Sequence, residues 1–155
     1  MGHLASLEPI TVLIAEDSSL DYQLLEHALL ETRSHIQAKR AFDGTEVVKY
    51  LKGEAEYGDR SVHPFPQIII VDLKMPLMSG FEVLEWIRDN PYYRVIPTIV
   101  LSTSTEPQDV QRAYELGANT YFTKPSRLPE LRSLCFHLAE YWGRAEIPQR
   151  PRIPA

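Results

Sequence analysis

The sequence is poor in cysteine, with Cys135 as the single thiol among 155 residues. One cysteine cannot form an intrachain disulfide, and it cannot supply a Cys-x-x-Cys metal site. This composition is compatible with a reducing compartment, and we expect a cytoplasmic protein. Because Cys135 falls on the apolar face of a predicted helix, we expect a buried thiol without a catalytic role.

Long hydrophobic runs and clusters of basic residues are also missing. No apolar run exceeds four residues, as in Ile68–Val71, whereas a membrane span needs roughly 18. The segment 1–6 has no basic stretch followed by an apolar one, so we expect no secretory leader. The net charge is −5 without a lysine or arginine cluster, which argues against nucleic-acid binding. We therefore expect neither nucleic acid nor a membrane as a partner.

Short apolar runs alternate along the chain with segments of helical periodicity. The predicted strands are 10–15, 36–40, 68–71, 97–102 and 119–122, and the predicted helices are 18–31, 43–52, 80–90, 107–116 and 128–142. A run of β-branched residues without alternation, as at 68–71, is typical of a parallel strand buried on both faces. Five such units predict an α/β fold, with a five-stranded, doubly wound, flavodoxin-like parallel sheet and five helices.

One domain accounts for nearly the whole sequence. We expect it to span 9–142, with a surface loop at 53–66 and a proline-rich tail at 143–155, and we expect no output domain. In the first helix, the apolar face is predicted to contain Leu20, Leu24, Leu25, Ala28 and Leu29.

Residues whose side chains can bind ions or take part in reactions lie at the ends of the predicted strands. Glu16-Asp17 follows the first strand, Asp72 the third, Ser102 ends the fourth, and Lys124 follows the fifth. The carboxyl ends of parallel strands share one edge of a sheet and form the usual ligand site of such folds. We therefore expect three carboxylates, a hydroxyl and an ammonium to lie together.

This set of groups suits magnesium-dependent phosphoryl transfer. Carboxylates that lie close together repel one another, and the repulsion raises the pKa of at least one. Mg²⁺ relieves the repulsion, because it prefers carboxylate, carbonyl and water oxygens. Phosphoryl transfer depends mainly on positioning and on neutralising charge, which the metal, the lysine and the hydroxyl can supply. An aspartate can serve as the covalent acceptor.

Each of these residues also has an ordinary structural interpretation. Glu16-Asp17 could be solvated acids at a helix N-terminus, where negative charge is favourable. Asp72 could cap a turn, Lys124 could be a surface lysine, and Ser102 could belong to a polar loop. Their conjunction at the strand ends favours the chemical interpretation.

The motifs around these residues resemble the receiver domain of two-component response regulators over residues 9–142. They are Ile14-Ala15-Glu16-Asp17, Val71-Asp72-Leu73-Lys74-Met75-Pro76-Leu77-Met78-Ser79-Gly80, Leu101-Ser102 and Tyr121-Phe122-Thr123-Lys124-Pro125. The resemblance implies a CheY-like fold and a signalling protein that takes a phosphoryl group from a sensor histidine kinase. It also implies that the protein assists its own phosphorylation and dephosphorylation.

The resemblance assigns a role to each motif residue. Asp72 would be the phosphoacceptor, and Mg²⁺ would be held by Glu16, Asp17, Asp72 and the main-chain carbonyl of Lys74. Ser102 would bind a phosphoryl oxygen and switch position together with Tyr121, and Lys124 would pair with the phosphoryl group. The peptide bond before Pro125 would be cis. The side chain of Lys74 would either reach the phosphoryl group or point to solvent.

The long loop 53–66 and the absence of an output domain resemble the small stand-alone regulators of phytochrome-type histidine kinases. Output would pass through protein contacts of a face that phosphorylation reshapes. Phe136, Tyr141 and Trp142 of the last helix predict a homodimer, although they could instead fill the core.

Three other functions are weighed against this one. A haloacid-dehalogenase-type phosphatase uses a similar aspartate nucleophile, but it needs a second aspartate two positions later, where this chain has Lys74. A flavodoxin-like electron carrier needs a phosphate-friendly first loop, where Glu16-Asp17 places negative charge. A DNA-binding regulator needs a further domain, and we expect none because the residues after Trp142 leave no room for a helix-turn-helix unit.

Overall fold

The computed structural model describes residues 9–32 and 35–148. A single five-stranded parallel sheet forms its centre, in the order β2-β1-β3-β4-β5. The strands are β1 Ile10–Ala15, β2 Ile36–Ala41, β3 Ile68–Val71, β4 Thr98–Ser102 and β5 Thr120–Thr123. The helices are α1 Ser19–Leu30, α2 Gly44–Lys52, α3 Gly80–Asp89, α4 Pro107–Glu115 and α5 Leu128–Arg144. The predicted doubly wound fold is confirmed.

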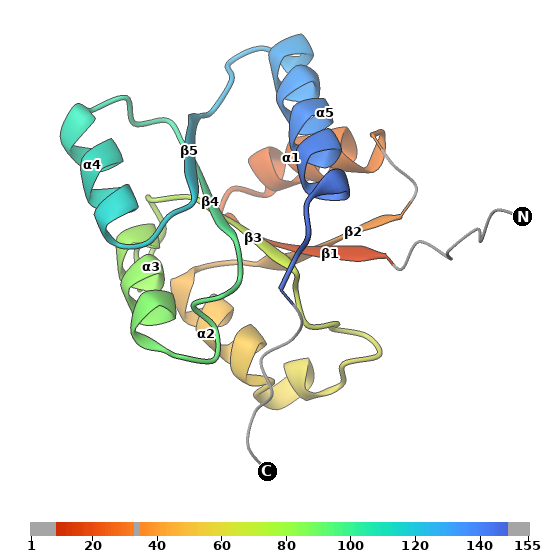
Figure 1. Cartoon of the computed structure of the whole chain (residues 1–155), viewed down its shortest axis with the longest axis vertical. Helices are drawn as coiled ribbons and strands as arrows, with labels where there is room; N and C mark the ends of the chain where they lie inside the picture. Colours follow the sequence, from red (N-terminus) through yellow and green to blue (C-terminus); the bar gives the residue numbers. More distant parts are fainter. Residues whose placement is uncertain (1–8, 33–34, 149–155) are drawn as a thin grey trace, which may run out of the picture.

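The helices cover the sheet in two layers, with α1 and α5 on one face and α2, α3 and α4 on the other (Figure 1). Each layer buries its own apolar core against the sheet. All four residues of Ile68–Val71 are buried, as expected for a central strand covered on both faces. The chain places β2 on one side of β1 and then crosses to place β3 on the other side, so the direction of strand addition reverses between β1 and β3. Such a reversal opens a ligand crevice at the carboxyl ends of the strands.

Side-chain caps define where several helices begin. The Ser18 hydroxyl accepts a hydrogen bond from the Asp21 amide. The Asp43 carboxylate and the Ser79 hydroxyl cap α2 and α3 in the same way. These caps satisfy amides that a helix leaves unpaired in its first turn. They therefore fix the points at which the loops after β1, β2 and β3 become helical.

The predicted apolar face of α1 is partly wrong. Leu25, Ala28 and Leu29 are buried, but Leu20 is 65% exposed and Leu24 is 39% exposed. A helix repeat of 3.6 residues places positions 20 and 24 at the margin of the stripe that meets the sheet. Contact with α5 therefore leaves these two leucines at the surface.

The segment 53–66 is more structured than the predicted surface loop. It contains a short 3₁₀ helix, η1 Ala55–Gly58, and it buries Tyr57 and Phe65. The Arg60 guanidinium donates hydrogen bonds to the carbonyls of Tyr50 and Leu51 at the end of α2. Arg60 thereby satisfies carbonyls that the helix leaves without partners.

Helix α5 continues two residues past its predicted end at Trp142, through Gly143 to Arg144. An ion pair of 3.3 Å between Arg144 and Glu140 spans this last turn. Beyond the helix, Ile147 packs against the α1 and α5 core. Even α5, the longest helix among the described residues, lacks the length and apolar character needed to cross a membrane.

Cys135 is fully buried within the α5 side of the core. Burial raises the pKa of its thiol to about 12, because a thiolate is poorly solvated there. The expectation of a buried thiol is confirmed.

Gly80 provides a test of how α3 is held against the site. A Cβ at this position would lie 2.2 Å from the main-chain oxygen of Asp72 and 2.7 Å from the Cα of Leu73. We expect Gly80→Ala to lower the free energy of unfolding by about 3 kcal/mol, because the backbone after β3 must move. Urea denaturation measures this loss. Gly143→Ala, in the exposed last turn of α5, is the control and should change stability by less than about 1 kcal/mol. Equal stabilities of the two variants would contradict the close approach.

Candidate functional site

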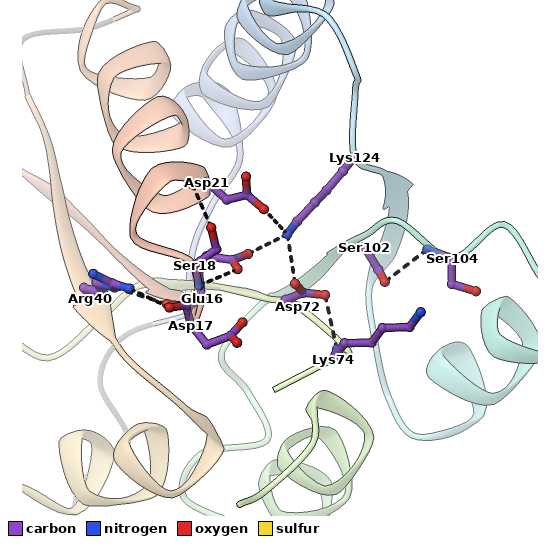
Figure 2. Close-up of polar contacts among 10 residues, drawn as sticks. All are labelled: Glu16, Asp17, Ser18, Asp21, Arg40, Asp72, Lys74, Ser102, Ser104 and Lys124. Carbon is purple, nitrogen blue, oxygen red and sulfur yellow. Dashed lines mark hydrogen bonds and ion pairs between the residues drawn. The ribbon is translucent and has the colours of Figure 1, made fainter. Parts of the chain in front are cut away.

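The carboxyl ends of the strands bring together four of the predicted residues, Glu16, Asp17, Asp72 and Lys124 (Figure 2). Lys124, which follows β5, places its Nζ 2.7 Å from Oε2 of Glu16 and 2.9 Å from Oδ2 of Asp72. Glu16 follows β1 and Asp72 follows β3. The convergence predicted from the strand ends is therefore present in the structure.

Three of the acids lie close enough together to hold a divalent cation. One carboxylate oxygen each from Glu16, Asp17 and Asp72 lies within 4.8 Å of the other two. Glu16 and Asp72 are buried, whereas Asp17 is exposed and its carboxylate has no hydrogen bond or ion pair among the described residues. An all-oxygen set with one open, solvated side suits Mg²⁺, which retains several waters when bound.

Burial and charge shift the pKa values of this cluster. Burial is the largest cause that raises the pKa of Glu16, and the nearby Asp72 charge adds to it, while the Lys124 hydrogen bond opposes both. Burial alone would lower the pKa of Lys124, but its hydrogen bonds to Asp72 and Glu16 outweigh burial and raise that pKa. Lys124 is therefore a permanent cation between two carboxylates that would otherwise repel each other.

The loop after β3 bends around Asp72. The amide of Lys74 donates a hydrogen bond of 3.2 Å to Oδ1 of Asp72, which holds the backbone of Lys74 beside the carboxylate. The Lys74 side chain is exposed and extends away from Glu16 and Asp17 (Figure 2). Metal coordination by its carbonyl stays a prediction. The predicted cis bond before Pro125 is wrong, since none of the described peptide bonds is cis, and Lys124 reaches the carboxylates with a trans bond.

Ser102 is fully buried at the end of β4, and its hydroxyl accepts a hydrogen bond of 3.3 Å from the Ser104 amide. No hydrogen bond among the described residues joins the Ser102 hydroxyl to Asp72 or Lys124. The backbones are linked, however, because the Lys124 amide donates to the Ser102 carbonyl at 2.7 Å. Ser102 therefore lies at the same edge of the sheet as Asp72 and Lys124, but its hydroxyl is hydrogen-bonded to the Ser104 amide.

Tyr121 connects the same loop to β5. Its hydroxyl donates a hydrogen bond of 2.8 Å to the carbonyl of Ser104, and its ring packs against the core under α2, α3 and α4. The Ser104 hydroxyl in turn donates to Asp109 in the first turn of α4. Ser104 thus links both predicted switch residues, Ser102 and Tyr121, to helix α4.

Two residues of the site were not predicted from the sequence. The guanidinium of Arg40, at the end of β2, donates to the carbonyls of Glu16 and Asp17, each at 3.1 Å. Asp21, in the first turn of α1, places its Oδ2 3.1 Å from the Lys124 ammonium. The position of Arg40 near the end of a predicted strand was a usable signal, whereas Asp21 lies within the predicted helix 18–31 and not at a strand end.

The fold and the acidic pocket together define a phosphoryl-accepting signalling domain, and comparison with known proteins agrees. Residues 12–135 match the family model of the response regulator receiver domain. The chain belongs to this family, whose members are phosphorylated by histidine kinases.

Two relatives illustrate the likeness. Response regulator Rcp1 of Synechocystis sp. is 33% identical over 134 residues, which cover 86% of this chain and 89% of that protein. The phosphorylated cyanobacterial phytochrome response regulator RcpA is 32% identical, with a TM-score of 0.84 over 91% of this chain and 99% of that one. The Mn²⁺-bound form of Rcp1 matches with a TM-score of 0.81 at 32% identity, over 91% of this chain and 100% of that one.

A substitution of Arg40 tests whether this residue holds Glu16 and Asp17 in place. Arg40→Lys retains the charge but cannot bridge the carbonyls of Glu16 and Asp17. We expect Mg²⁺ affinity to fall about tenfold, as is usual when a group that orients metal ligands is lost. Isothermal titration calorimetry measures the affinity.

Arg60→Lys is a matched control for this experiment. Arg60 also donates to main-chain carbonyls, but these belong to Tyr50 and Leu51 at the end of α2 and to His63. Its replacement should leave Mg²⁺ affinity unchanged. Equal affinities of the Arg40 and Arg60 variants would show that Arg40 does not hold the acidic loop.

Proposed function

We propose that this protein accepts a phosphoryl group from a sensor histidine kinase onto Asp72 and requires Mg²⁺ to do so. The observation that carries the proposal is the pocket in which Glu16, Asp17 and Asp72 converge beside the Lys124 ammonium. The family match supports the same reaction. The receiver unit would comprise residues 9–142, as the sequence predicts, and helix α5 extends two residues beyond it to Arg144.

The chain's own residues explain how Asp72 acts as the acceptor. A carboxylate oxygen of Asp72 attacks phosphorus, the bond between phosphorus and the histidine nitrogen breaks, and the imidazole leaves with the bonding electron pair. Mg²⁺, held by Glu16, Asp17, Asp72 and the Lys74 carbonyl, would neutralise charge on the phosphoryl oxygens. Lys124 already contacts Oδ2 of Asp72, so its ammonium is in place to pair with the transferred group.

Phosphorylation would switch the face formed by α4, β5 and α5. A phosphoryl group adds about −1.5 to −2 charge and new acceptor oxygens. The Ser102 hydroxyl accepts a hydrogen bond from the Ser104 amide, so its own proton can be donated to one of these oxygens when the side chain turns toward Asp72. Because Ser104 also contacts Asp109 and Tyr121, this turn of Ser102 would move the loop before α4 and carry Tyr121 with it.

We propose that the protein also contributes to its own dephosphorylation. Lys74 has an exposed side chain at the mouth of the pocket, and its amide contacts the Asp72 carboxylate. From this position the Lys74 ammonium can approach a phosphoryl group on Asp72 and influence the attack of water. Turnover of free phosphomonoesters, as by a haloacid-dehalogenase-type phosphatase, is not favoured, because a lysine stands where that chemistry needs an acid.

The partner kinase would be of the phytochrome type, and the protein would act in the cytoplasm. The likeness to RcpA, a phytochrome response regulator, supports the choice of kinase. The buried, unpaired Cys135 is compatible with a reducing compartment.

The α5 helix supports a homodimer. Phe136 is 53% exposed and Tyr141 is 66% exposed, whereas Trp142 is half-buried and packs on the core. Beside them lies an open groove of roughly 700 Å³, lined by residues of β5 and α5 that include Phe122, Leu134 and Leu138. Exposed aromatic residues along such a groove are typical of protein interfaces.

Incubation with acetyl phosphate and Mg²⁺ tests the phosphoacceptor. We expect intact-mass spectrometry to show one added phosphoryl group on the wild type and none on Asp72→Asn, because the amide cannot form the acyl phosphate.

After removal of the donor, the decay of the label in wild type and Lys74→Ala tests the influence of Lys74. An unlabelled wild type would refute the acceptor, and equal decay rates would refute the role of Lys74.

Sedimentation velocity tests the dimer. We expect the wild type to sediment as a dimer and the double variant Phe136→Ser/Tyr141→Ser as a monomer, because two exposed aromatic contacts are lost. Leu77→Ser is the control, since it removes an 82% exposed leucine far from α5 in the sequence. A monomeric wild type, with and without beryllium trifluoride, would contradict the proposal.

A further inference from the structure

The Lys124 ammonium is shared by three carboxylates. Two of them, Glu16 and Asp72, belong to the acidic cluster at the strand ends, and the third is Asp21. Asp21 comes from the first turn of α1 and lies on the side of Lys124 opposite Ser102 (Figure 2). The ammonium is therefore held from the α1 side as well as from the acceptor side.

Asp21 differs from the other two acids in two respects. Its side chain is 44% exposed, whereas the side chains of Glu16 and Asp72 are 5% and 9% exposed. It also lies outside the group of carboxylates that could share a cation. Lys124 is the only partner of the Asp21 carboxylate among the described residues. Any effect of the Asp21 charge through direct contact is therefore exerted on the lysine.

Phosphorylation changes what the ammonium must neutralise. The phosphoryl group on Asp72 adds negative charge next to the place where Lys124 already sits. To pair with the new oxygens, the ammonium must leave at least one of its present carboxylates. An exposed ion pair is weaker than a buried one and is the first to be exchanged.

We propose that Asp21 is a positioning residue that competes with the phosphoryl group for Lys124. While the pair persists, the ammonium is drawn toward α1 and away from the side on which Ser102 lies. The Asp21 charge also repels an incoming anionic phosphodonor. Asp21 thereby slows phosphorylation of Asp72 and weakens the hold of the pocket on a bound phosphoryl group, and it neither gains nor loses a covalent bond in the reaction.

This inference rests on Asp72 being the phosphoacceptor, and its test uses the purified full chain. The variant Asp21→Asn removes the charge at constant size, and Asp21→Glu keeps the carboxylate. Asp89→Asn removes an exposed charge in α3, where its partner is Arg88, and controls for the change in net charge. The two readouts are the rate of labelling by acetyl phosphate with Mg²⁺ and the affinity for beryllium trifluoride by calorimetry.

We expect Asp21→Asn to label about two- to fivefold faster than wild type and to bind beryllium trifluoride more tightly by a similar factor, which is the usual strength of an exposed ion pair. Asp21→Glu and Asp89→Asn should behave as wild type. The gain should shrink in high salt, because the pair is partly exposed. Damage to the fold cannot imitate this result, since it would slow labelling.

Several results would overturn the inference. They are an Asp21→Asn rate equal to or below that of wild type, an equal gain in Asp89→Asn, or an Asp21→Glu variant as fast as Asp21→Asn. A wild type that takes no label at all would instead refute the phosphoacceptor itself. The two failures are therefore distinguishable.

Discussion

The Lys124 ammonium balances the negative charge at the rim of the sheet. Its nitrogen lies 2.7 to 3.1 Å from carboxylates that follow β1, begin α1 and follow β3. Two of these carboxylates are buried, and without a cation their repulsion would oppose the close approach of the strand ends. Any group that adds negative charge to Asp72 must therefore redistribute the contacts of this one lysine.

The backbone connects this charge balance to the face that would transmit the signal. Lys124 and Ser102 are joined by a main-chain hydrogen bond of 2.7 Å between β5 and β4. Ser104 then links the Ser102 hydroxyl to Tyr121 and to the first turn of α4. These contacts are the route by which we propose that a change of charge at the end of β3 alters the position of α4.

The remaining parts of the site are held in place through contacts to their main chain. The close approach of Gly80 fixes the start of α3 against Asp72, and Arg40 holds the carbonyls of the acidic pair. The mobile elements would be the side chains of Ser102, Tyr121 and Lys124. A fixed acidic pair with exchangeable hydroxyl and ammonium groups is suited to a reversible switch.

The sequence alone determined the order of strands and helices and most of the site, because period and burial are local properties and parallel strand ends share one edge. Glu16, Asp17, Asp72 and Lys124 lie together as predicted. The tertiary structure decided the pairing of Asp21 with Lys124, which are separated by 103 residues. It also decided the hydrogen bonds from Arg40 to the carbonyls of Glu16 and Asp17. The exposure of Leu20 and the extension of α5 to Arg144 were decided in the same way. A repeat in the sequence shows that a helix has an apolar stripe, but only the packing of remote elements decides which side chains that stripe buries and which charges meet.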